Sequence, residues 1–321
     1  MNNKSLAFTL ALLITITGCQ DDPAPSMEPE AERFLNEVVG VMEKNSINRK
    51  TIDWQDFKTK VFEEAKGATT IASTYPAVKL ALQMLGDHHS FFVDAQGQSF
   101  NAGTSQCNAE IIVKPSMPAG IGYVRVNAFS GGSNDDKAVA FAREIQSQIK
   151  AQDSEQITGW IVDLRSNLGG NMWPMLAGIG PILGEGTAGY FIDANGNQSS
   201  WGFNNGTSVV NGIAATSILD SYVLLKPEPK VAVLLDNGVA SSGEAIAIAF
   251  VGRSNTKSFG SSTCGLSTSN QGFTLSDKSQ LYLTSSYMAD RNKKLFGVPV
   301  VPDVASASGN VVNDALEWIG K

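Results

Sequence analysis

Two stretches of this chain share one pattern: a short apolar run, a turn rich in glycine, and then a segment with helical spacing. The first runs from Gly159 to Asn171 (GWIVDLRSNLGGN) and the second from Lys230 to Val251 (KVAVLLDNGVASSGEAIAIAFV). Continuous apolar runs of this length are typical of strands buried on both faces, as in parallel sheets. Strands that alternate with helices predict an α/β core, with both turns at the same edge of the sheet.

The second turn places Ser241 at the start of the predicted helix. Backbone N–H groups point outward there and favour negative charge, so this serine could be a nucleophile whose reaction builds an oxyanion. Ser241 and Glu244 also form the Ser-x-x-Glu pattern of a capping box, in which the serine only caps the helix. The stretch alone favours the cap, because capping boxes are common.

The rest of the chain divides into a helical part and a mixed part. Apolar residues recur at helical spacing from Ala31 to about Leu85, which predicts a small helical N-terminal region over residues 31–95. We expect residues 96–321 to form the α/β core. Its further elements are strands at 121–126 and 281–288, helices at 138–149 and 311–319, a hairpin at 190–201 and an extended segment at 297–304. Residues 202–218 are too polar and glycine-rich to assign.

Composition limits the classes of partner. The 321 residues, 42% hydrophobic and 17% charged, are globular in character and can bury an ample core. A net charge of -7 argues against nucleic acid or an anionic membrane surface as the main partner. No Cys/His cluster has metal-ligand spacing and no glycine motif is of the phosphate-binding kind, so we expect no metal and no cofactor.

The first 18 residues predict an export signal, because Lys4 precedes an apolar stretch that is too short to span a bilayer comfortably. The run ITGC, ending at Cys19, resembles a bacterial lipobox, in which the cysteine receives the lipid; a plain signal peptide is the alternative. Gln20, by resemblance to the sorting rule of Gram-negative lipoproteins, favours an outer-membrane anchor facing the periplasm. Residues 19–30 then predict a flexible tether. We therefore expect a lipid-anchored protein of the cell envelope.

Two further cysteines, Cys107 and Cys264, remain in the mature chain. Export to an oxidising compartment permits a disulfide between them, and free buried cysteines fit the sequence equally well.

The only histidines, His88 and His89, are adjacent in the run LGDHHSFF after a predicted helix. Adjacent side chains on a helix point in different directions, so at most one of them faces a given site. They can be a polar helix end, or one of them can be a catalytic base.

Five segments resemble, in order, the serine peptidase family of C-terminal processing proteases and tricorn core proteases. They are LGDHHSFF, GWIVDLRSNLGGN, VAVLLDNGVASSGEA, FGSSTCGLST and GVPVVPDV. The resemblance covers roughly residues 76–304. The resemblance implies a crotonase-like ββα-superhelix core, a helical N-terminal part, and a peptide or protein substrate. Many members insert a PDZ domain ahead of the core, but residues 92–120 are too few for one.

The resemblance assigns roles residue by residue. Ser241 falls on the nucleophile position, and the N–H groups of Ser242 and of Gly169 or Gly170 fall on the oxyanion-hole positions. Paired glycines after a strand also fit a simple tight connection to a helix.

The base is where this chain departs from half of the family. Processing proteases place a lysine after a Thr-x-Gly turn, whereas Leu266 follows that turn here and cannot accept a proton. The tricorn-like branch uses a histidine from the N-terminal part, and His89 falls on its position. An unperturbed imidazole pKa of about 6.5 suits a base near neutral pH.

The acid that would orient His89 is the weakest match. The tricorn-like branch has a glutamate where Lys294 stands, so Asp290 is the nearest candidate and Glu244 a second. Either carboxylate could instead be a surface charge or a cap.

Three hypotheses remain, and the retained serine, histidine and glycines favour the first. It is an exported serine peptidase with Ser241 as nucleophile and His89 as base. The second is an inactive ligand- or peptide-binding protein on the same scaffold, and the third another acyl-transfer reaction. The sequence leaves the substrate and the oligomeric state open.

Overall fold

The structure is a computed structural model that describes residues 26–103 and 106–320. The predicted export signal, Cys19 and most of the predicted tether lie outside the described residues. None of the helices within the described ranges is both long and apolar enough to cross a membrane.

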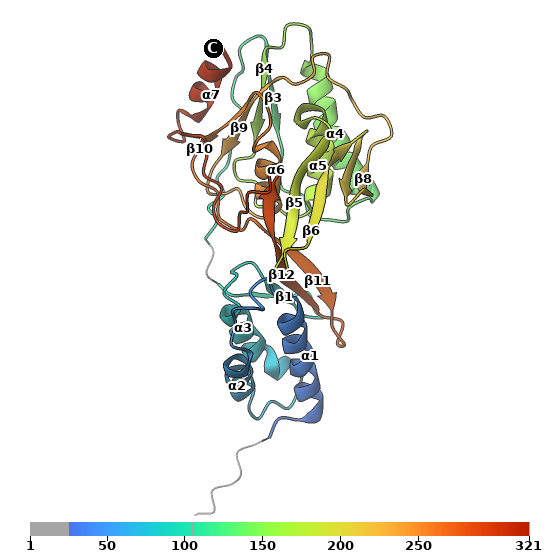
Figure 1. Ribbon diagram of the computed structural model, residues 1–321, viewed down its shortest axis with the longest axis vertical. Coiled ribbons are helices and arrows are strands. Elements are labelled where there is room, and N and C mark those ends of the chain that lie inside the picture. The colour runs from blue at the N-terminus through green and yellow to red at the C-terminus, as the bar shows by residue number, and fades with distance from the viewer. Residues whose placement is uncertain (1–25, 104–105, 321) are drawn as a thin grey trace, which may run out of the picture.

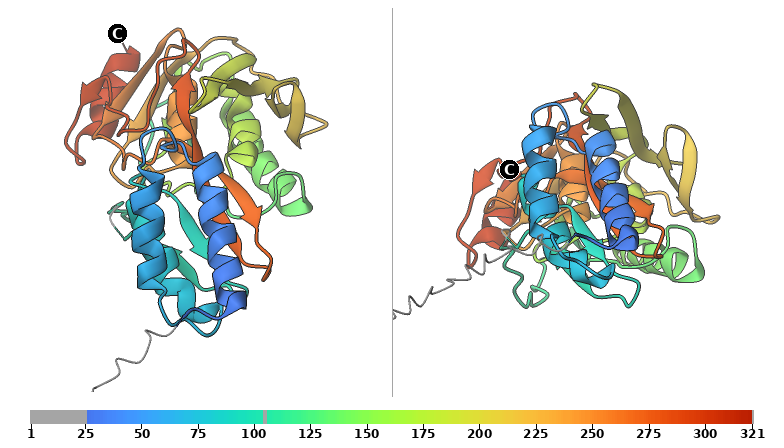
Figure 2. Two further views of the ribbon diagram at one scale, coloured as in Figure 1. Left: turned by 60° about the horizontal axis from the view of Figure 1, so that its bottom comes forward. Right: turned by 90° about the horizontal axis from the view of Figure 1, so that it is seen from below.

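The N-terminal region is helical, as the apolar periodicity predicts. It contains α1 (Pro29–Asn45), α2 (Trp54–Glu64), a 3-10 turn η1 (Ala72–Thr74) and α3 (Tyr75–Met84). The apolar stripes of these helices form one buried cluster, which includes Phe34, Val38, Phe57 and Leu82. Figures 1 and 2 show these helices gathered at one end of the molecule. The cluster also includes Phe92, Leu281 and Leu283, so the helices share this core with strands from both parts of the chain.

The first sheet is parallel and has the strand order β13-β10-β9-β4-β3. Its strands are β3 (Ile121–Arg125), β4 (Gly159–Asp163), β9 (Lys230–Leu235), β10 (Thr256–Gly260) and β13 (Val304–Ala305). Both predicted apolar runs, β4 and β9, are neighbours in the middle of the sheet. Because they are parallel neighbours, the turns that follow them meet at one edge, as predicted.

Helices cover both faces of this sheet, and alternate side chains of each strand face opposite clusters. Val231 and Val233 pack in the larger cluster with α5 (Met172–Leu183) and α6 (Ser242–Phe250), and α4 (Asp136–Gln152) packs there too. Ala232 and Leu234 face the smaller cluster with α7 (Val311–Gly320). The chain is thus a mixed α/β protein.

The second sheet is antiparallel and joins the helical region to the core. Its order is β2-β1-β12-β5-β6-β7-β8, and β11 also pairs with β12. The strands are β1 (Phe91–Val93), β2 (Ser99–Asn101), β5 (Gly186–Asp193), β6 (Gln198–Asn204), β7 (Thr207–Val210), β8 (Ile213–Ser217), β11 (Thr268–Thr274) and β12 (Gln280–Asp290). One end of β12 pairs with β1 and the other with β5, so this strand spans both regions (Figure 1).

Residues 202–218, which the polarity of the sequence leaves unassigned, form the end of β6 and all of β7 and β8. The two turns are Asn205-Gly206 and Asn211-Gly212, and all four residues have positive φ. Asn-Gly is the preferred pair for two-residue hairpin turns, because both central residues need that conformation. The signal was therefore present in the sequence.

Cys107 and Cys264 form a disulfide, with their Cα atoms 5.2 Å apart. It joins the segment between β2 and β3 to the turn after β10, across 157 residues of sequence.

We expect the double variant Cys107→Ser, Cys264→Ser to lose roughly 2–5 kcal/mol of unfolding free energy, since a cross-link across so long a loop restricts the unfolded chain. Chemical denaturation, followed by circular dichroism, measures this loss. Wild type in a reductant is the control and should lose a similar amount. An unchanged denaturation midpoint would show that the disulfide adds no stability.

Candidate active site

Ser241 lies at the N-cap of α6 in a conformation that is rare for a residue with a side chain, with φ 52° and ψ -117°. Such backbone strain persists only where surrounding contacts impose it, and it concentrates at functional sites. Here the Ser241 N–H donates to Glu244 Oε2 at 2.9 Å, and the Ala240 N–H donates to the carbonyl of Asn167 at 3.0 Å. The turn at Ser241 is thus held from both sides.

Glu244 is fully buried and organises this turn. Its Oε1 accepts hydrogen bonds from Thr263 Oγ1 at 2.5 Å and from the Gly265 N–H at 2.8 Å. Burial is the largest influence on the Glu244 pKa and raises it, while these hydrogen bonds and the one from Ser241 act in the opposite direction. Its contact with the Ser241 N–H is one half of the predicted capping box, so a cap and a nucleophile can share this position.

His89 reaches Ser241 across 152 residues of sequence, with Nε2 3.0 Å from Ser241 Oγ. Its backbone N–H donates to Asp87 Oδ1, which also accepts the Ser90 N–H, and His88 between them has a positive φ of 58°. This short turn aims His89 at the core. Burial lowers the pKa of His89 to about 4, and the smaller effect of the Asp87 charge raises it. The ring is therefore neutral near pH 7.

Neither predicted acid is a hydrogen-bond partner of the His89 ring nitrogens, whose partners are Thr268 and Ser241. Asp290 Oδ1 accepts the backbone N–H groups of Asn292 and Lys294, so its carboxylate closes the turn after β12. Within the described ranges, no carboxylate oxygen is hydrogen-bonded to either ring nitrogen of His89. The second nitrogen, Nδ1, instead lies 2.7 Å from Thr268 Oγ1. Thr268 belongs to the FGSSTCGLST segment. The sequence prediction considers only carboxylates as partners of the histidine, so it does not include this hydroxyl.

The glycine turn after β4 packs directly against the turn at Ser241. A Cβ on Gly169 would lie 2.6 Å from the Ala240 carbonyl oxygen, so no larger residue fits without a shift. The Gly169 N–H donates to Asn167 Oδ1 at 3.0 Å. Gly170 has a φ of 108°, and its carbonyl accepts the hydroxyl of Ser242 at 2.6 Å.

The N–H of Gly170 takes no part in the backbone pairing between the glycine turn and Phe129. The bridge between Phe129 and Gly170 uses the Gly169 carbonyl and the Asn171 N–H. In a parallel bridge of this kind the N–H of Gly170 itself points away from the partner strand. The N–H of Ser242, at the first position of α6, likewise has no acceptor within the helix.

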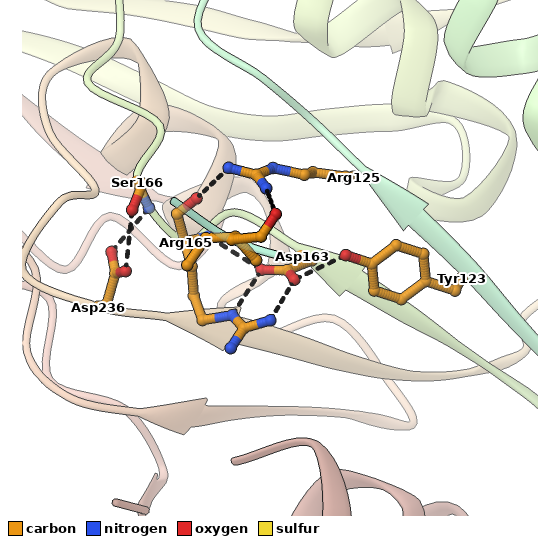
Figure 3. A network of polar contacts seen from close by, with 7 residues as sticks. Tyr123, Arg125, Asp163, Arg165, Ser166 and Asp236 are labelled. Carbon is orange, nitrogen blue, oxygen red and sulfur yellow. Dashed lines mark hydrogen bonds and ion pairs between the residues drawn. The ribbon is translucent and has the colours of Figure 1, made fainter. Parts of the chain in front are cut away.

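A polar network surrounds the ends of β4 and β9, from which the two turns start (Figure 3). The Asp163 carboxylate is fully buried and binds the guanidinium of Arg165 at 2.6 Å and the hydroxyl of Tyr123 at 2.8 Å. Asp236, which follows β9, accepts the backbone N–H of Ser166 at 2.8 Å. Because Ser166 follows β4, this bond ties the two strand ends together.

A pocket of about 340 Å³ opens beside His89, lined by residues that include His89, Phe91, Asn101, Cys107 and Leu266. It can accept part of a substrate next to the histidine. Leu266 therefore contributes to a wall near the site. In the described residues, no three His, Cys, Asp or Glu side chains come together in a way that could hold a metal ion.

Comparisons with known proteins show what this chain is similar to. The nisin-resistance protein of Lactococcus lactis subsp. lactis is 30% identical over 292 residues, which are 91% of this chain and 87% of that protein. A lipoprotein from Streptococcus agalactiae has a similar fold, with a TM-score of 0.72 and 21% identity over 92% of this chain and 97% of that one. The photosystem II D1 C-terminal processing protease matches with a TM-score of 0.55 and 15% identity over 87% and 94%.

A family model gives the most direct assignment. It matches residues 120–306, which are more than half of the chain and include both glycine turns and Ser241. The protein belongs to Peptidase family S41.

Proposed function

We propose that this protein is an exported serine peptidase in which Ser241 is the nucleophile and His89 the base. The observation that carries the proposal is the 3.0 Å separation between His89 Nε2 and Ser241 Oγ, which is the distance of a hydrogen bond along which a proton can move. Family membership supports peptides or proteins as the substrates.

The proposed reaction begins when Ser241 Oγ attacks a peptide carbonyl and His89 Nε2 takes the hydroxyl proton. The carbonyl oxygen becomes an oxyanion, for which we assign the N–H groups of Ser242 and Gly170 as donors. We place Gly170 ahead of Gly169 because the Gly169 N–H already donates to Asn167. His89 then gives its proton to the leaving amine, and water hydrolyses the acyl-enzyme by the same steps in reverse.

We also propose that the chain is anchored by a lipid on Cys19 at the outer membrane, facing the periplasm. A disulfide in the core is consistent with an oxidising compartment, and one structural neighbour is itself a lipoprotein. The name of the Lactococcus relative makes nisin a first compound to test as a substrate. An inactive binding protein on this scaffold is the second candidate, favoured by the lack of a carboxylate at the histidine.

A fluorophosphonate probe distinguishes the two candidates, because it reacts only with an activated serine. We expect wild type to be labelled, Ser241→Ala not to be labelled, and His89→Ala to react roughly 100-fold or more slowly, which is the usual contribution of a general base. Lys257→Ala is the matched control, because Lys257 is an exposed basic residue on β10 and should label like wild type. Labelling that survives in Ser241→Ala would remove the nucleophile assignment, and a wild type that neither labels nor cleaves peptides would favour the binding protein.

We expect the labelling rate to stay level from pH 8 to about pH 5 and to fall only near pH 4. Burial holds the pKa of His89 at about 4, so the imidazole remains neutral, and able to accept a proton, well below its ordinary value. Asp87 is the charged group that acts on the ring, and Glu244 lies under Ser241. Circular dichroism at each pH verifies that the protein is folded. A midpoint near 6.5 would contradict the buried, neutral base.

The lowered pKa of His89 also makes the free energy of unfolding depend on pH. The unfolded chain binds a proton to this histidine below about pH 6.5, whereas the folded chain binds it only near pH 4. Wild type should therefore lose unfolding free energy as the pH falls from 6.5 to 4, and His89→Gln should lose less. Denaturant titrations of both proteins at pH 7 and pH 4.5 measure the difference, and equal losses would contradict it.

A further inference from the structure

The imidazole of His89 makes a hydrogen-bond contact at each ring nitrogen, and both partners are hydroxyl groups. Nε2 lies 3.0 Å from Ser241 Oγ, and Nδ1 lies 2.7 Å from Thr268 Oγ1. Thr268 is 6% exposed and begins β11, where its own N–H donates to the carbonyl of Leu266. The contact at Nδ1 is thus buried and built on a strand.

The chemistry proposed for Ser241 requires one particular form of this ring. A neutral imidazole carries its proton on one nitrogen and accepts at the other. Nε2 can take the proton of Ser241 only if it is bare, so Nδ1 must carry the N–H. That N–H needs an acceptor, and once the ring is protonated both nitrogens are donors. The hydroxyl oxygen of Thr268 can accept in both states.

β11 holds His89 at a second point. Asn270 Nδ2 donates to the backbone carbonyl of His89 at 2.9 Å, and Asn270 Oδ1 accepts the hydroxyl of Thr284 on β12. On the other side, the Asp87 carboxylate accepts the His89 N–H. The backbone of His89 is therefore fixed from two directions, and the Thr268 contact determines how the ring turns about its own side-chain bonds.

We propose that Thr268 is the positioning residue of this site and takes the place of a carboxylate: its hydroxyl oxygen accepts the Nδ1–H of His89. It thereby selects the tautomer in which Nε2 faces Ser241 and gives the protonated ring a partner during the reaction. This role depends on the proposed peptidase function, but the hydrogen bond between Thr268 and His89 can be measured without any enzymatic activity.

The test compares the full mature chain with Thr268→Val, which keeps the shape and removes the acceptor, and Thr268→Ser, which keeps it. Nitrogen-15 NMR of the imidazole groups reads the tautomer directly, because the protein has only two histidines and His89→Gln identifies the signals of His89. We expect the Nδ1–H form in wild type and in Thr268→Ser, and a shift towards Nε2–H in Thr268→Val. We expect fluorophosphonate labelling of Thr268→Val to be roughly 10- to 100-fold slower, and that of Thr268→Ser to be close to wild type.

The outcomes separate the two proposals. An Nε2–H tautomer in wild type overturns the role of Thr268, and this measurement needs no variant to fold. Labelling of Thr268→Val at the wild-type rate, with an unchanged tautomer, overturns it as well. If no protein is labelled but Thr268→Val still changes the tautomer, the hydrogen bond stands and the peptidase function fails. A purely structural role predicts equal losses in Thr268→Ser and Thr268→Val and no change of tautomer in either.

Discussion

The hydrogen bonds of one buried carboxylate, Glu244, hold the turn at Ser241, and the rest of the candidate site depends on this turn. A buried carboxylate is costly unless hydrogen bonds satisfy it, and Glu244 receives them from Thr263, Gly265 and the backbone of Ser241. These partners come from α6 and from the loop after β10. The strained conformation of Ser241 persists because they over-determine it. The disulfide at Cys264 lies between two of them, so it anchors the same loop to the segment that follows β2.

The candidate site also requires that a histidine from the end of the helical region reach a serine in the sheet core. The antiparallel sheet meets this requirement, because β12 pairs with β1 beside the helices and with β5 beside the core. β1 begins two residues after His89, and β11, also paired with β12, begins with Thr268. The strand that joins the two regions thus also positions the histidine and its partner. A change of register along β12 would move His89 and Thr268 relative to each other.

Local pattern predicts most of the fold, and the family resemblance predicts Ser241 and His89 as candidate site residues. The buried strands and the helical stripes follow from periodicity, because periodicity depends on neighbours in sequence. Asp290 shows where the family resemblance fails. Its place near a family motif made it the candidate acid, but its carboxylate is used by the turn at Asn292 and Lys294. Thr268 was out of reach, because a hydroxyl becomes a histidine partner only through strand pairing, and pairing between distant strands leaves no local signal.

The position of the carboxylate changes the electrostatics of the site. In a Ser-His-Asp triad the negative charge lies behind the histidine, where it raises the basicity of the ring and stabilises its protonated form. In this protein the buried carboxylate lies under the serine turn instead, and the histidine has a hydroxyl at its second nitrogen. The Asp87 charge offsets only part of the effect of burying the ring, so burial lowers the pKa of His89 to about 4. In the proposed mechanism, this arrangement lowers the driving force for proton transfer from Ser241 to His89, and it keeps the imidazole unprotonated in mildly acidic surroundings.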